Sequence, residues 1–307
     1  MDFGRRPALL GAALLLLAAA PTPLAEKRWL ASGPERLRAL THRPGECLSL
    51  PADAGLRQSV EVGRAAFRSP LVLGGPAARA GLSCDSCHRD GRGNRLFQFP
   101  GVSGPPGTAD VTTSRFSSHR GNGVDDPVAI PDLSGPKAAL KVSQDPAGRD
   151  LSHFIEGLIT QEFDGPTPSP AVLEGLAAYV RALDPAACPA GAQPRSAAAL
   201  LQDADRAVAA GRLALAKGDA DTALTMISAA RAGLGRIDER YDGLEASRAA
   251  LRRADEALAA AARAVRASAP DAAARLAAWP PDDLAAPLER QAEESLFNPA
   301  RLAEHGL

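Results

Sequence analysis

Two cysteines and a histidine stand together at positions 84–88, in the segment Cys-Asp-Ser-Cys-His. On one helical turn, the sulfurs of Cys84 and Cys87 can each bond a vinyl group of a porphyrin. The same turn carries the imidazole of His88 under the ring toward the iron. A redox pair or half of a zinc site would use the cysteines but leave the histidine unexplained. The motif therefore predicts one covalently bound haem c, with His88 as the proximal iron ligand.

The N-terminus is typical of an export signal. Residues 1–25 combine two arginines, an apolar run and then small residues with prolines, and the run is short for a membrane span. Covalent haem attachment takes place outside the bacterial cytoplasm, so we expect a periplasmic protein. Cleavage near Ala25 is the expected processing, although Pro23 fits the cleavage pattern poorly. An uncleaved signal that anchors the chain to a membrane is the alternative.

Two further cysteines, Cys47 and Cys188, bracket the haem motif. In an oxidising compartment they are candidates for a disulfide that ties the first segment of the haem region to its last. Such a long loop would contribute roughly 5 kcal/mol to stability before strain is subtracted. Two separate thiols are the alternative. The formal net charge of −1 gives no argument for nucleic-acid binding.

Helical patterns flank the motif. Apolar or small residues recur at spacings of three and four at Leu56, Val60, Gly63 and Phe67, which predicts a helix over 56–67 that ends before Pro70. Gly63 would allow a second helix to approach closely. After the haem motif, the segment 97–117 is rich in glycine and proline, which predicts an ordered loop. Its phenylalanines would cover the porphyrin or fill the core beneath the loop.

The segment Gly-x-Ala-x-Phe-x-Ser-Pro-Leu at 63–71, together with the haem motif, resembles one haem-binding half of the bacterial di-haem cytochrome c peroxidase superfamily. The resemblance continues weakly through 120–136 and 148–159 and ends at 172–183, where the family has its closing helix. It covers about residues 56–185, and only the haem motif is specific. It implies a cytochrome c-like domain in which the first and last helices cross beside the haem.

Two departures from that family limit what the resemblance implies. The chain has a single haem motif, and its only methionines are Met1 and Met226, outside the predicted haem domain. A methionine from that domain is thus excluded as the sixth iron ligand. The resemblance places His119 similarly to a distal histidine of the family, so His119 is the predicted sixth ligand. The alternatives are water, an empty position, or one of three other histidines: His42, His153 and His305.

The sixth ligand decides the chemistry. Two imidazoles would saturate the iron and favour electron transfer, whereas an open position would admit peroxide. Peroxide cleavage would also need an acid–base group, for which His153 and Glu162 are candidates. For Glu162 the alternative is a solvated carboxylate at a helix end, and for His119 and His153 it is a histidine without an iron-binding role.

Alanine, arginine and leucine dominate the chain after about residue 190. The pattern predicts a helical hairpin that turns at Gly218 and Asp219, and a third helix over 241–265. Leu244, Leu251 and Leu258 repeat at sevenfold spacing in that helix, which suits packing within the chain or a short coiled coil with a second copy. No catalytic constellation is evident in this half.

The predicted organisation is all-α: a signal peptide (1–25), a mono-haem cytochrome c domain (26–190) and an alanine-rich helical domain (191–307). The expected function is electron transfer to or from a redox partner protein, with the helical domain positioning that partner or forming a homodimer. A haem peroxidase or oxidase is the alternative, and an electron carrier is favoured over an enzyme. A scaffold with an idle haem is the third class.

Overall fold

The computed structural model describes residues 24–305, without the side chain of Ala138, and it is mostly helical, which confirms the all-α prediction. Residues 1–23, most of the predicted export signal, lie outside the described residues. The last two residues of that predicted signal are described: Leu24 is 2% exposed and packs in a small core with Leu30 and Leu40. Among residues 24–305, no helix combines the length and the apolar character that crossing a membrane would require.

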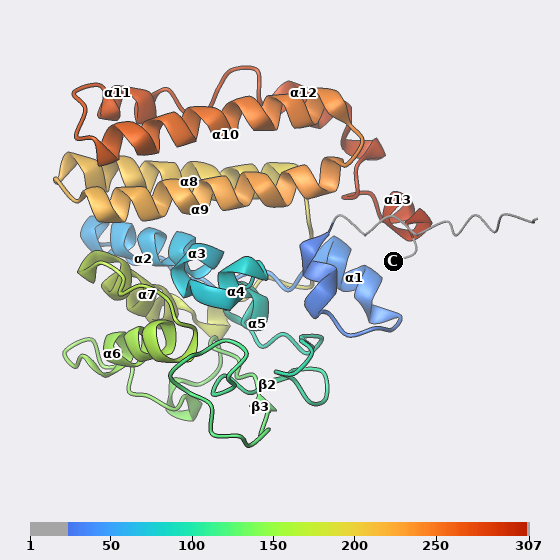
Figure 1. The fold of residues 1–307 in the computed structure, drawn as a ribbon, viewed down its shortest axis with the longest axis vertical. Coiled ribbons are helices and arrows are strands. Elements are labelled where there is room, and N and C mark those ends of the chain that lie inside the picture. Colours follow the sequence, from blue (N-terminus) through green and yellow to red (C-terminus); the bar gives the residue numbers. More distant parts are fainter. Residues whose placement is uncertain (1–23, 306–307) are drawn as a thin grey trace, which may run out of the picture.

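The three longest helices of the described residues lie in the second half of the chain, after the haem motif (Figure 1). The helices of the first half are α1 (Glu35–Thr41), α2 (Ala54–Phe67), α3 (Pro70–Leu73), α4 (Gly75–Arg79), α5 (Cys84–Cys87), α6 (Asp150–Gly157) and α7 (Pro170–Ala182). Those of the second half are α8 (Ala197–Ala216), α9 (Ala220–Asp238), α10 (Glu245–Arg266), α11 (Ala272–Ala277), α12 (Ala285–Arg290) and α13 (Pro299–Glu304). Two antiparallel strand pairs join β1 (His42–Arg43) to β4 (Gln193–Pro194) and β2 (Thr108–Ala109) to β3 (Val128–Ala129).

Helices α2 and α7 are the predicted first and last helices of the haem region, and they cross at two glycines. A Cβ atom added to Gly63 would lie 1.8 Å from the carbonyl oxygen of Gly175, so the two backbones touch where a side chain would hold them apart. Asp53 caps α2 by accepting a hydrogen bond from the Leu56 amide at 2.8 Å. Val60 on α2 and Tyr179 on α7 are buried in the same core.

The first and last segments of the first half are joined by a disulfide and by backbone hydrogen bonds. Cys47 and Cys188 form a disulfide across 141 residues, as predicted. Beside it, the amide of Asp184 donates to the carbonyl of Cys47 at 2.7 Å. The β1–β4 pair lies just outside the disulfide and joins residues 42–43 to 193–194. The segment that carries the haem motif is therefore a closed loop.

The second half is built from α8, α9 and α10. Helices α8 and α9 form the predicted hairpin, with Asp219 at its turn capping α9 through the Thr222 amide. Helix α10 begins at Glu245 rather than at 241, because Tyr241 belongs to the 3-10 helix Glu239–Tyr241 and its hydroxyl donates to the Leu288 carbonyl at 2.8 Å. Leu251 and Leu258 are buried against α9, α11 and α12, so the sevenfold seam packs within the chain. A dimer through these helices would have to use other faces.

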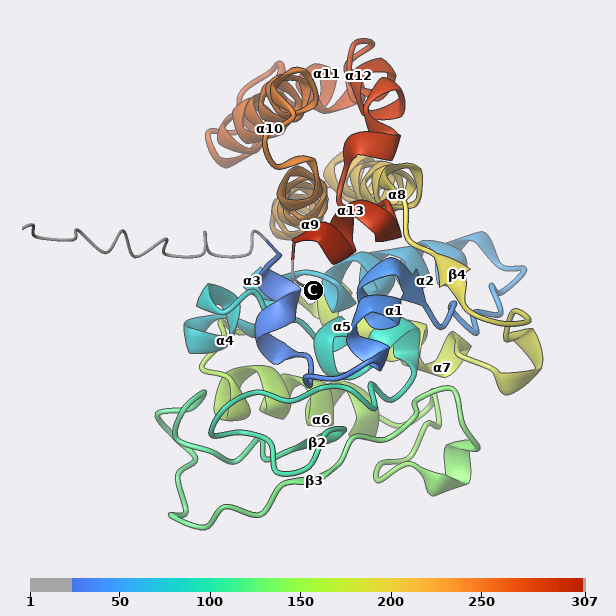
Figure 2. The same ribbon diagram turned by 90° about the vertical axis from the view of Figure 1, so that its right-hand side faces the viewer.

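The two halves are packed together, with α8 and α9 lying against α2 (Figures 1 and 2). The Gln58 side chain of α2 donates to the carbonyl of Ala210 on α8 at 3.2 Å. Met226 of α9 is fully buried and belongs to the same core as α2 and α7. The composition change near residue 190 marks a change in local structure, and the core continues across it.

Candidate haem site

Helix α5 is a single turn that holds the two free cysteines. Ser83 and Ser86 form a capping box at its start: the Ser86 hydroxyl accepts a hydrogen bond from the Ser83 amide at 3.0 Å. Cys84 and Cys87 are unpaired and pack against the core shared by α2 and α7. Burial raises the pKa of Cys84 to about 12 and also raises the pKa of Cys87. Both are therefore neutral thiols at neutral pH, which disfavours the redox-pair alternative because that chemistry needs a thiolate.

His88 ends the turn, and its ring is fixed by a distant part of the chain. Its Nδ1 lies 3.0 Å from the carbonyl oxygen of Pro131, and since a carbonyl only accepts, Nδ1 carries the proton. Burial lowers the pKa of His88, so its neutral form is favoured and Nε2 keeps a free electron pair. A histidine that binds a metal through one nitrogen commonly donates from the other to a carbonyl. The donor set Cys84, Cys87 and His88 thus fits a haem c.

Aromatic side chains gather in the loops after the motif. The rings of Phe99 and Phe116 are 5.3 Å apart, and those of Phe116 and Phe163 are 5.5 Å apart. They belong to the core that Cys84 and Cys87 also contact. The loop phenylalanines therefore contribute to the apolar surroundings of the motif, as expected.

The zinc alternative would need a set of ligands close together among the described residues. Across residues 24–305, no group of three or more His, Cys, Asp or Glu side chains is placed to hold a metal ion. A zinc site needs such a group, whereas a haem takes four of its iron ligands from the porphyrin.

His119, the predicted sixth ligand, lies at the surface. Its side chain is 56% exposed and its Nε2 is 3.7 Å from Oδ1 of Asp164. The Ser118 amide also donates to Asp164, at 2.8 Å, so this carboxylate holds the loop. His153 is exposed on α6. The imidazole of His42 lies 2.9 Å from the Thr41 hydroxyl.

Glu162 differs from the solvated carboxylate that the sequence suggested. It is 7% exposed, ends the π-helical turn Leu158–Glu162 and directly precedes Phe163 of the aromatic cluster. Burial raises its pKa, with Arg120 acting in the opposite direction from 3.5 Å. Its Oε2 has no hydrogen-bond partner among the described residues. Glu162 is thus a buried carboxyl group that holds a proton more readily than an ordinary glutamate.

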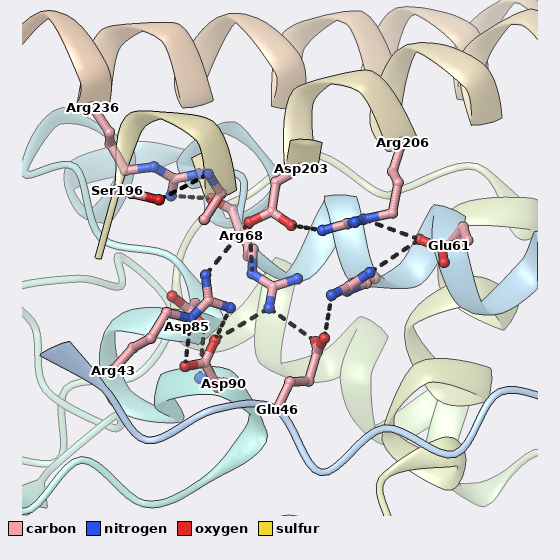
Figure 3. A network of polar contacts seen from close by, with 12 residues as sticks. Arg43, Glu46, Glu61, Arg68, Asp85, Asp90, Ser196, Asp203, Arg206 and Arg236 are labelled. Atoms are coloured by element: carbon pink, nitrogen blue, oxygen red, sulfur yellow. Dashed lines mark hydrogen bonds and ion pairs between the residues drawn. The ribbon is translucent and has the colours of Figure 1, made fainter. Parts of the chain in front are cut away.

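A buried ion network lies behind α5 and was not foreseen from the sequence (Figure 3). Asp90, two residues after His88, accepts two hydrogen bonds from Arg43 and one from Arg68 at 3.2 Å. Arg68 also binds Glu46 at 2.9 Å and lies 3.9 Å from Asp203 of α8. These arginines hold the pKa of Asp90 and of Asp203 below the usual range. The network links the haem motif to the helical half.

One local sequence feature could have drawn attention to Asp90. The sequence Arg-Asp-Gly-Arg-Gly that contains Asp90 is typical of a turn, and Asp90 adopts a left-handed conformation there, with φ of 54°. Its partners are 47 and 22 residues away in the chain, so the pairing depends on the fold.

The chain was also compared with known proteins. No protein-family model, no curated protein and no solved structure matches it.

Proposed function

We propose that this protein is an exported, periplasmic c-type cytochrome with one haem c, which transfers electrons to or from a redox partner protein. Cys84 and Cys87 tether the haem, and His88 is the proximal ligand. The observation that carries the proposal is the hydrogen bond from Nδ1 of His88 to the Pro131 carbonyl, next to two unpaired cysteines on one turn. A bound haem would supply a one-electron redox centre.

Each residue of the site has a defined task in this proposal. The Pro131 carbonyl fixes the tautomer of His88 and keeps Nε2 available for iron. Phe99, Phe116 and Phe163 form an aromatic cluster in the core that Cys84 and Cys87 also contact, which would limit the access of water to the motif. Lower water access and a fixed imidazole both reduce reorganisation when the charge of the site changes.

His119 remains our proposal for the sixth ligand. With a second imidazole the iron would be saturated, which suits outer-sphere electron transfer. For this role the His119 ring must exchange its contact with Asp164 for the iron.

The first experiment is production in a host that exports proteins and attaches haem c. We expect a coloured protein whose mass includes one haem, and loss of covalent haem in Cys84→Ala/Cys87→Ala. His88→Ala should keep the haem attached but change its spectrum, whereas His153→Ala should match the wild type. A colourless wild-type protein without added mass would overturn the proposal.

The sixth ligand is tested in the haem-loaded protein. His119→Ala should convert a low-spin ferric spectrum to a high-spin one that responds to cyanide. An unchanged spectrum would remove His119 from the site.

A peroxidase is the second candidate, and the burial of Glu162 beside Arg120 favours it. A carboxyl group with a raised pKa can take up and return a proton at Oε2 more readily than an ordinary glutamate. If this candidate is correct, Glu162→Gln should lower peroxide turnover about a hundredfold. Under the electron-carrier proposal there is no peroxide turnover to lose.

A further inference from the structure

A cavity of about 290 Å³ lies between the two halves of the molecule. Its wall includes Ser83, Asp85 and Ser86 of the motif turn on one side, and Arg236 of α9 on the other. Among the described residues, the lining does not include Cys84, Cys87 or His88. The cavity is therefore separate from the candidate haem site, although it shares a helix with it.

The arginines around this cavity fall into two groups by their carboxylate partners. In one group, Arg43 and Arg68 pair with three carboxylates: those of Asp90 and Asp203, which line the cavity, and that of Glu46, which lies outside the lining. We call the other group the four-arginine end; it contains Arg89, Arg195, Arg236 and Arg240.

A single carboxylate serves three of these four arginines. Glu26 forms ion pairs with Arg89, with Arg195 at 2.6 Å and with Arg240 at 3.7 Å. Glu239 also lines the cavity, but burial raises its pKa, and it accepts a hydrogen bond from the Ala25 amide at 3.1 Å. Asp85 also lines the cavity and acts on Arg89 and Arg236 without forming an ion pair with either. Four arginines therefore face three carboxyl groups, those of Glu26, Glu239 and Asp85, and positive charge exceeds negative charge.

Arg236 has no carboxylate partner among the described residues. Its Nη1 donates to the carbonyl of Arg68 at 3.0 Å (Figure 3). The Nε atoms of Arg236 and Arg195 are both buried and both lack a hydrogen-bond partner. Buried donors without acceptors are rare in proteins, and these two can donate to an anion that enters the cavity. Oδ2 of Asp203, which also lines the cavity, is a buried acceptor without a hydrogen-bond partner among the described residues.

The pKa shifts agree with this imbalance. Burial lowers the pKa of Arg89, Arg236 and Arg240, the last to about 10, and neighbouring arginines lower it further. Asp85 and Asp203 oppose this shift at Arg236, and Glu26 opposes it at Arg240. For Arg43 and Arg68, the carboxylates outweigh burial and raise the pKa. Arg89, Arg236 and Arg240 thus receive less compensation from carboxylates than Arg43 and Arg68 do.

We propose that the four-arginine end of this cavity binds a small oxyanion carrying two or more negative charges. Guanidinium groups bind the oxygens of phosphates, sulfates and carboxylates in pairs, which suits several arginines around one anion. The bound anion joins Arg89, which directly follows His88, to Arg236 on α9. It therefore stabilises the contact between the halves.

The test compares the folded full-length protein with two variants in low-salt buffer at neutral pH. Arg236→Gln removes the unpaired guanidinium. Arg231→Gln is the matched control, because Arg231 lies on the same helix but pairs with Asp255 at 2.7 Å. Calorimetric titrations with sulfate, inorganic phosphate, succinate and citrate measure the binding.

We expect the wild type and Arg231→Gln to bind at least one of these anions with equal affinity, and Arg236→Gln to bind it about tenfold more weakly. Preference for sulfate and phosphate would define an inorganic or phosphoryl ligand, and preference for succinate or citrate a carboxylate ligand. Equal affinity in all three proteins, or no binding of any anion by the wild type, would overturn the proposal.

Circular dichroism before the titrations verifies that each variant is folded. If Arg236→Gln does not fold, Arg195→Gln is the second variant. It should also weaken binding about tenfold. Because these titrations do not depend on haem, a negative result leaves the cytochrome proposal untouched.

Discussion

Each half of the molecule is stabilised by a different kind of internal contact. In residues 24–190, the main ties join segments far apart in the chain, such as the disulfide and the 2.7 Å hydrogen bond from the Tyr179 hydroxyl to Glu46. In residues 191–305, helices that follow one another pack through small side chains, among them Ala204, Ala230, Ala254 and Ala261. Local structure therefore dictates the second half, whereas the first half depends on closure of its ends.

Removal of the disulfide is the largest test of this difference. The double variant Cys47→Ser/Cys188→Ser should lose about 5 kcal/mol of unfolding free energy, because the unfolded loop of 141 residues gains freedom. Urea unfolding followed by circular dichroism measures it. We expect the helices of the second half to unfold later than the first half in this variant. A loss below about 1 kcal/mol would contradict the dependence on closure.

Asp203 tests the connection between the halves. Arginines 68 and 43 hold its pKa below the unfolded value, so its stabilising effect is present above about pH 4 and is lost as pH falls. Asp203→Asn should lower stability at pH 7 by about 3 kcal/mol, because it leaves buried arginines short of a partner.

The pH dependence gives the sharper result for Asp203. Below about pH 4, the wild type should lose stability more steeply than Asp203→Asn, by up to about 1.4 kcal/mol per pH unit. Asp255→Asn, which affects a more exposed pair, serves as the control. If the unfolding free energies of the wild type and Asp203→Asn fall in parallel as the pH is lowered, the network does not stabilise the folded state.

Glycine substitutions compare helix packing in the two halves. Gly63→Ala should cost about 3 kcal/mol, since the new Cβ would overlap the backbone of Gly175. Gly233→Ala on α9 meets its nearest atoms at 3.9 Å and should be neutral or stabilising by about 0.5 kcal/mol. Thermal unfolding of both variants measures the difference. Equal effects would show that the α2–α7 crossing tolerates separation.

The smallest effect is expected at the surface of α10. Arg252 pairs with Glu245, but the two side chains are 52% and 75% exposed. Arg252→Ala should change the unfolding free energy by less than about 0.5 kcal/mol. A larger loss in urea titrations would mean that the second half also relies on ion pairs.

Much of the fold could be predicted because the signals are local. The spacing of Leu56, Val60 and Phe67 gave a helix over 56–67, and α2 runs from Ala54 to Phe67. The hairpin turn at Gly218 and Asp219 and the pairing of Cys47 with Cys188 were also correct. The likeness to a cytochrome c domain stays a prediction.

The missed features depend on contacts between distant segments. The four-arginine end joins Glu26 to arginines 63, 169 and 214 residues later in the chain, and no sequence spacing indicates such a group. For Glu162, a solvated carboxylate at a helix end was the alternative to an acid–base role. It is buried because the π-helical turn and the loop that carries Arg120 enclose it.

Closure of the first half also determines what a single backbone cut would do. Residues 118–126 are exposed and lie between the haem motif and Cys188 in the chain. A protease could therefore cut the backbone there. After such a cut the two fragments stay joined through sulfur and separate on a denaturing gel only after reduction. Any colour from a thioether-linked tetrapyrrole would then travel with the N-terminal fragment alone.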